Sequence, residues 1–94
     1  VWEMDPADWA WVLGVNLMGV VHGLRAFVPA MLEAAAADPG YQGHIVNTAS
    51  MAGLVNVPNL GVYNVGKHAV VSLSETLHHD LALVTDRVRT SVLC

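Results

Sequence analysis

The 94-residue sequence predicts an α/β fold in which two long helices alternate with two strands of a parallel sheet. Apolar residues recur at helical spacing in two long segments, and a short run rich in β-branched residues follows each segment. The order helix, strand, helix, strand contains one βαβ unit, whose crossover is expected to be right-handed. No repeat or low-complexity stretch divides the chain, so we expect one piece of a single doubly wound domain.

The first helix is predicted to run from Pro6 to about Ala37. Asp5 is a favourable N-cap residue, and Pro6 suits the first helical position. An apolar stripe then continues at helical spacing, formed by Trp9, Val12, Leu13, Leu17, Val20, Val21, Leu24, Val28, Met31 and Leu32. Asn16 lies on this stripe, where a buried amide without a partner would cost about 1–3 kcal/mol. We therefore expect Asn16 to be hydrogen-bonded, either to neighbouring backbone or to a functional partner.

Two strands and a second helix follow. Residues 43 to 50 are apolar and β-branched, and they predict a buried strand with Ser50 at its carboxyl end. The second helix is predicted over residues 61 to about 84, and residues 88 to 94 predict another strand. Ligands of open α/β sheets bind at the carboxyl ends of the strands, which draws attention to Ser50. The apolar residues 54 to 60 beyond it fit a substrate wall and a buried connection equally well.

Tyr63 and Lys67 lie four residues apart in the second predicted helix, and Ser50 lies thirteen residues before Tyr63. A free phenol ionises near pKa 10, so a tyrosine exchanges protons near neutral pH only beside positive charge. Side chains four apart on a helix are neighbours, and one ammonium contributes about 3 kcal/mol to a phenolate at an effective dielectric near 20. A second positive charge is also needed, which an oxidised nicotinamide ring could supply. Without its surroundings, the pair fits a surface ring and a solvated amine better.

Three segments together resemble the short-chain dehydrogenase/reductase family, in its compact single-domain form. They are residues 15 to 19 (Val-Asn-Leu-Met-Gly), residues 45 to 53 (Ile-Val-Asn-Thr-Ala-Ser-Met-Ala-Gly) and the Tyr63-x-x-x-Lys67 pattern followed by His-Ala-Val. The resemblance implies that Tyr63 is the general acid/base and that Lys67 stabilises its phenolate and holds the nicotinamide ribose. It also implies that Ser50 hydrogen-bonds the reacting oxygen of the substrate and that Asn16 anchors a proton-relay water near Lys67. The chain departs from the family at Asn64-Val65-Gly66, where many members carry Ala-Ser before the lysine.

The resemblance covers the whole chain, but the chain covers only part of the family's domain. The glycine-rich phosphate loop and the Asn-Asn-Ala-Gly segment of the family are absent. Residues 1–94 are therefore expected to be the catalytic segment of an incomplete Rossmann-type doubly wound parallel sheet, with the N-terminal dinucleotide-binding half missing. The implied function is hydride transfer between NAD or NADP and a secondary alcohol or ketone, with the isolated segment inactive. The alternative is a non-catalytic dinucleotide-sensing or oligomerisation subunit on the same scaffold.

Composition limits the partners. The net charge is −4, and only Arg25, Lys67, Arg87 and Arg89 are fixed cations, which argues against nucleic acid. The single cysteine, Cys94, excludes an internal disulfide, and no set of residues has zinc-ligand spacing.

The apolar stretches also bear on location and assembly. Asn16, His22 and Arg25 interrupt them, so no membrane span is expected and a cytoplasmic protein is predicted. The mean hydropathy of +0.48 is high for a small free-standing domain. In the resembled family the two long helices form the main subunit interface, which implies a homo-oligomer.

Overall fold

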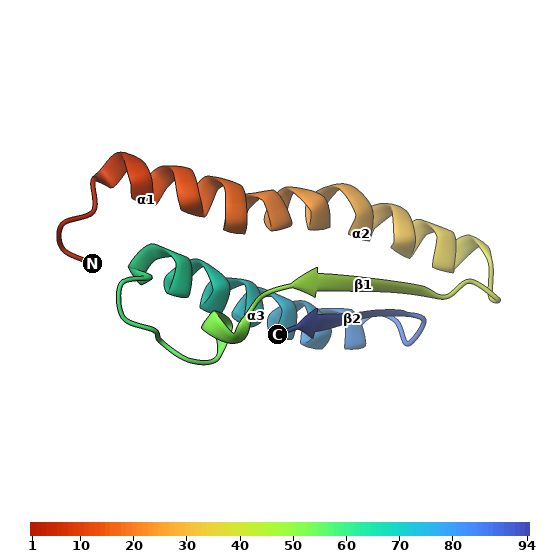
Figure 1. Cartoon of the computed structure of the whole chain (residues 1–94). Coiled ribbons are helices and arrows are strands. Elements are labelled where there is room, and N and C mark those ends of the chain that lie inside the picture. The colour runs from red at the N-terminus through yellow and green to blue at the C-terminus, as the bar shows by residue number, and fades with distance from the viewer.

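The computed structural model describes residues 1–94 in the predicted order of helix, strand, helix and strand (Figure 1). The elements are helix α1 (Pro6–Leu13), a π-helical segment η1 (Gly14–Met18), helix α2 (Gly19–Ala37), strand β1 (Gly43–Thr48), a short 3-10 helix η2 (Met51–Gly53), helix α3 (Gly61–Ala82) and strand β2 (Val88–Leu93). The α/β class is thereby confirmed. Strand β1 ends two residues before Ser50, and α3 ends two residues earlier than predicted.

The first helical run is continuous but not uniform. Asp5 caps it as predicted, since the Asp5 carboxylate accepts a hydrogen bond of 2.9 Å from the backbone N–H of Ala7. The run then passes through five π-helical residues, η1, before it resumes as α2 and ends at Ala37. The sequence therefore predicted the extent of this helix but not the change of winding at Asn16, which the apolar periodicity does not encode.

The two strands form a parallel pair, as expected for a βαβ unit. The register pairs Gly43 with Val88 and Thr48 with Leu93. Burial alternates along β2, where Val88 and Thr90 are buried while Arg89 and Ser91 are exposed. One face of the sheet therefore carries the packed helices, and the other face is open.

The core joins both long helices to the sheet. Its fully packed centre is made by Ala35 of α2, Leu81 of α3 and Val88 of β2. Arg87 holds the same end of the molecule together, because its guanidinium donates to the backbone carbonyls of Ala35 and Asp38 at the end of α2. This core lies at the amino ends of the strands, so it leaves their carboxyl ends free for a site.

The reason for expecting no membrane span in the first helix does not hold. The run Pro6–Ala37 has 32 residues and is long and apolar enough to cross a membrane by length and composition. Asn16, His22 and Arg25 do not lower its hydropathy enough to exclude a span, because no more than two residues of the apolar window are charged. Core helices of soluble domains meet the same criterion, so helix length does not distinguish the two.

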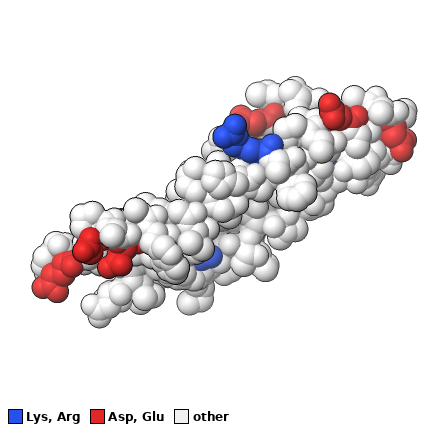
Figure 2. Space-filling view, turned by 90° about the horizontal axis from the view of Figure 1, so that it is seen from above, with Lys and Arg blue, Asp and Glu red and all other residues white.

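Charged side chains are sparse on the surface. Figure 2 shows acidic side chains near both ends of the elongated molecule, with few basic side chains on the same face. The basic side chains lie nearer the middle, and most of the rest of this face is uncharged, which agrees with the low overall content of charged residues, 13%.

Candidate active site

Ser50 lies between β1 and η2, at the carboxyl end of the sheet. Its hydroxyl oxygen accepts a hydrogen bond of 3.2 Å from the backbone N–H of Ala52, so Ser50 is the N-cap of η2. The side chain is half-buried. Because the hydroxyl oxygen acts as an acceptor in this contact, its hydrogen is free to be donated to another oxygen.

The turn after Ser50 packs directly on α3 at the level of Lys67. A Cβ atom at Gly53 would lie 3.0 Å from the Lys67 carbonyl oxygen and 2.8 Å from Cγ2 of Val71. Only glycine allows this close approach of two backbones. Gly53 therefore brings Ser50 and Lys67, which are distant in sequence, to the same end of the fold.

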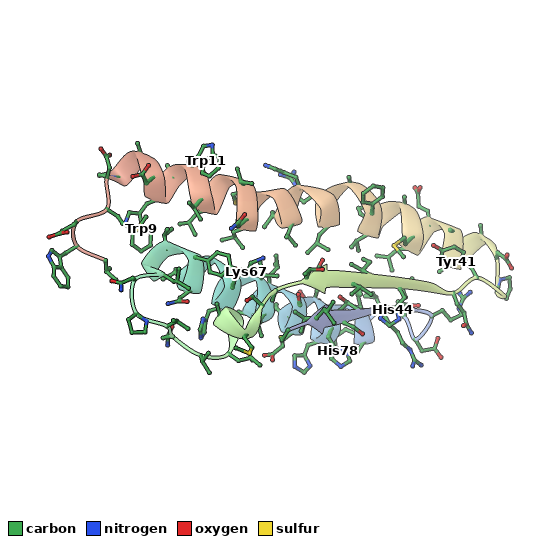
Figure 3. The ribbon with its side chains drawn as sticks, viewed as in Figure 1. Trp9, Trp11, Tyr41, His44, Lys67 and His78 are labelled. Atoms are coloured by element: carbon green, nitrogen blue, oxygen red, sulfur yellow. The ribbon has the colours of Figure 1, made fainter.

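Lys67 and Tyr63 face one another on the first two turns of α3. The ammonium nitrogen of Lys67 lies 5.6 Å from the centroid of the Tyr63 ring. It also donates a long hydrogen bond of 3.5 Å to the carbonyl of Thr48, the last residue of β1. Figure 3 shows Lys67 below the α1–α2 run, near the carboxyl end of β1. The structure thus brings the ammonium between the strand end and the phenol ring.

Asn16 lies in η1, which packs against α3. At Gly66, beside Lys67, a Cβ atom would lie 3.6 Å from Cδ2 of Leu13, so the first helical run passes close to this part of α3. The Asn16 side chain is half-exposed and forms no hydrogen bond within the chain. The alternative of a hydrogen bond to neighbouring backbone was therefore wrong, because Asn16 is only partly buried and water can solvate its amide.

The structure also contains buried polar residues to which no sequence motif gives a role. Asn47 of β1 donates a hydrogen bond of 3.0 Å to the hydroxyl of Ser74, and Ser74 donates one of 2.7 Å to the carbonyl of Val70. Asn64 of α3 donates a hydrogen bond of 2.8 Å to the carbonyl of Val57. For Ser74 the available signal was its position four residues after Val70 on the apolar face of the second helix, whereas the periodicity does not mark Asn64 as buried.

Residues 54 to 60 are all exposed, so the alternative of a buried connection was wrong. The two largest cavities lie elsewhere. One of about 510 Å³ is lined by polar residues near Gln42 and Arg89, and one of about 500 Å³ lies between α2 and β1. Neither is lined by Ser50, Tyr63 or Lys67, which are all partly exposed.

Comparison with known proteins identifies relatives of the whole chain. The family model for short chain dehydrogenase matches residues 1–94. An uncharacterized NAD-dependent oxidoreductase of Mycobacterium tuberculosis is 42% identical over 90 residues, which are 96% of this chain and 31% of that protein.

Solved structures agree with the sequence match. A short chain dehydrogenase/reductase from Burkholderia phymatum, in complex with NAD, is 54% identical in sequence and superposes with a TM-score of 0.92. The match covers 100% of this chain and 32% of that chain. A short chain dehydrogenase from Burkholderia cenocepacia J2315, in complex with NADP, is 27% identical in sequence and superposes with a TM-score of 0.76. The match covers 94% of this chain and 33% of that chain. The chain spans about a third of the length of the relatives it matches.

Proposed function

The chain belongs to the short chain dehydrogenase family, and from this premise we propose that residues 1–94 are the catalytic segment of an NAD(P)-dependent oxidoreductase. The proposed substrate is a secondary alcohol or the corresponding ketone. The observation that carries the proposal is the position of the Lys67 ammonium, between the Tyr63 ring and the end of β1. We further propose that the rest of a longer domain supplies the phosphate-binding half.

The residues present fit the nicotinamide end of such a cofactor. The Lys67 ammonium has three donors and makes one long hydrogen bond within the chain, to Thr48, so donors remain for ribose hydroxyls. The Tyr63 hydroxyl forms no hydrogen bond within the chain and is available to the ribose and the substrate alike. When bound, the nicotinamide ring accepts or gives the hydride.

The proposed roles of the side chains follow from their chemistry. In alcohol oxidation, Tyr63 in its phenolate form removes the hydroxyl proton, and the nearby ammonium of Lys67 stabilises that phenolate. Ser50 donates a hydrogen bond to the reacting oxygen and fixes its position. Asn16 anchors a water that carries protons between Lys67 and solvent. The four residues act as one set, so the loss of any one is expected to impair turnover.

Tyr63→Phe in the complete protein tests the assignment. Removal of the phenol oxygen should lower kcat by about 100-fold or more, the range of general acid–base catalysis, while cofactor binding persists. Steady-state kinetics and a titration with NADH or NADPH measure the two effects. Tyr41→Phe is the matched control, because Tyr41 packs against the core at the other end of the sheet and should leave kcat unchanged. Retained turnover in Tyr63→Phe would refute the assignment.

We also propose that the complete protein is a cytoplasmic homo-oligomer that pairs through its long helices. Trp11, Val15 and Met18 follow one another at helical spacing and are 70%, 55% and 40% exposed, which supports an apolar contact surface.

The alternative of a non-catalytic subunit predicts cofactor binding without turnover in the wild-type protein. The same kinetic measurement separates these two functions.

A further inference from the structure

Asn64, the residue directly after Tyr63, is a buried polar residue that holds the neighbouring loop at two points. It is 6% exposed in the first turn of α3. Its side-chain amide donates a hydrogen bond of 2.8 Å to the carbonyl of Val57. Its backbone N–H donates another of 2.8 Å to the carbonyl of Leu60. One residue thus connects the loop to the turn of α3 that presents Tyr63.

The loop has little other support. At its start, the backbone N–H groups of Leu54 and Val55 donate to the carbonyl of Met51. For residues 56 to 59, the bond from Asn64 to Val57 is the single hydrogen bond that the structure contains. Asn59 adopts a left-handed conformation with φ of 67°, which asparagine tolerates better than most residues. The position of the loop relative to Tyr63 therefore depends on Asn64.

The loop presents apolar side chains to solvent beside the proposed site. Leu54, Val55, Val57 and Leu60 are 63%, 49%, 41% and 42% exposed. Val57, whose carbonyl accepts the hydrogen bond from Asn64, is the middle residue of the segment 54 to 60. An apolar surface next to a proton-transfer site favours a substrate with an apolar substituent.

The other half of the Asn64 amide indicates why an asparagine stands at this position. Its oxygen, Oδ1, is buried and has no hydrogen-bond partner within the chain. A buried acceptor without a partner is destabilising, and an apolar side chain here would avoid that cost. The residue is therefore better explained by the hydrogen bond it donates than by packing.

We propose that Asn64 is a positioning residue that fixes residues 54 to 60 as the apolar wall of the substrate site. This inference rests on the proposed function. The enzyme should then prefer secondary alcohols and ketones with extended apolar substituents. This preference should depend on the hydrogen bond between Asn64 and Val57. Asn64 acts through the loop and touches neither the reacting atoms nor the cofactor.

The experiment compares Asn64→Ala and Asn64→Leu with Asn56→Ala in the complete protein. Asn56 lies in the same loop, is exposed and makes no hydrogen bond, so it is the matched control. The first readout is the initial rate of thermolysin cleavage between residues 54 and 60. Loss of the one hydrogen bond should raise this rate about fivefold in both Asn64 variants and leave it unchanged in Asn56→Ala. Asn64→Leu keeps a side chain of similar size without a donor and decides the test if Asn64→Ala does not fold.

The second readout is kinetic and compares 2-octanol with 2-propanol. In the Asn64 variants KM for 2-octanol should rise about fivefold, KM for 2-propanol should not change, and kcat should stay within about twofold for both. An unchanged cleavage rate would refute the anchor, whether or not the protein turns over a substrate. Faster cleavage with an unchanged ratio of KM values would refute the role in selectivity. If the wild-type protein oxidises neither alcohol and reduces neither ketone, the proposed function fails together with the substrate wall, whereas the cleavage rates still decide the anchor.

Discussion

At the scale of single residues, two glycines beside Lys67 should respond in opposite ways to the same added methyl group. At Gly53 the new Cβ would lie 2.8 Å from Val71 Cγ2 and 3.0 Å from a backbone oxygen, so Gly53→Ala should destabilise the fold by about 1–3 kcal/mol. At Gly66 its nearest neighbour would be Leu13 Cδ2 at 3.6 Å, which is ordinary contact. Gly66→Ala should therefore stabilise α3 by about 0.5–1 kcal/mol.

Urea unfolding of the complete protein measures both effects, and each variant serves as the control for the other. Gly53→Ala should also lower kcat, because the backbone must shift where the Ser50 turn packs on α3. A Gly53→Ala protein as stable as the wild type would contradict the close approach. A destabilised Gly66→Ala protein would contradict the 3.6 Å spacing between a Cβ at position 66 and Leu13 of α1.

At the scale of elements, a buried polar pair connects β1 to α3 near the candidate site. Asn47 and Ser74 are 8% and 2% exposed, and Asn47 donates to Ser74, which donates to the Val70 carbonyl. Ser74→Ala should cost about 1–3 kcal/mol, because it leaves the Asn47 amide buried without its partner. The Asn47→Ala, Ser74→Ala double mutant should be more stable than the sum of the single losses by about 0.5–1.5 kcal/mol.

A double-mutant cycle on the free energy of unfolding checks this coupling. Ser72→Ala is a suitable control, since Ser72 is exposed on the same helix and should change stability little. Strict additivity of the Asn47 and Ser74 effects would show that the two side chains do not interact in solution.

The elements also show which structural features the sequence encodes locally. Capping by Asp5 and apolar periodicity predicted the helices and strands to within a few residues. The spacing of Tyr63 and Lys67 predicted their proximity, because one helical turn determines it. By contrast, the Asn47–Ser74 bond joins residues 27 apart in sequence. The π-helical winding at Asn16 has no periodic signature either. Such features depend on how the elements pack, which a pattern along one chain does not specify.

At the scale of the whole molecule, the chain exposes more surface than a compact protein of its mass. Its accessible area is 6226 Å² for 10.0 kDa, whereas a folded monomer of that mass exposes about 5,200 Å². Its radius of gyration is 15.4 Å, against about 12 Å for a compact domain of this length. An excess of about 1,000 Å² is the size of a protein interface. The high mean hydropathy therefore corresponds to surface that further strands, helices or a partner subunit would cover.

This excess predicts how the chain behaves by itself. The isolated 94 residues should bind the dye 1-anilinonaphthalene-8-sulfonate (ANS) and self-associate as their concentration rises, because Trp11, Phe27 and Val46 are 70%, 65% and 60% exposed. A protein of the full length of the relatives should bind little ANS at the same molar concentration. Light scattering after size exclusion measures the association, and dye fluorescence measures the exposed apolar surface. An isolated chain that is monomeric at every concentration and silent to the dye would contradict this account, since its apolar faces would then be covered without additional structure.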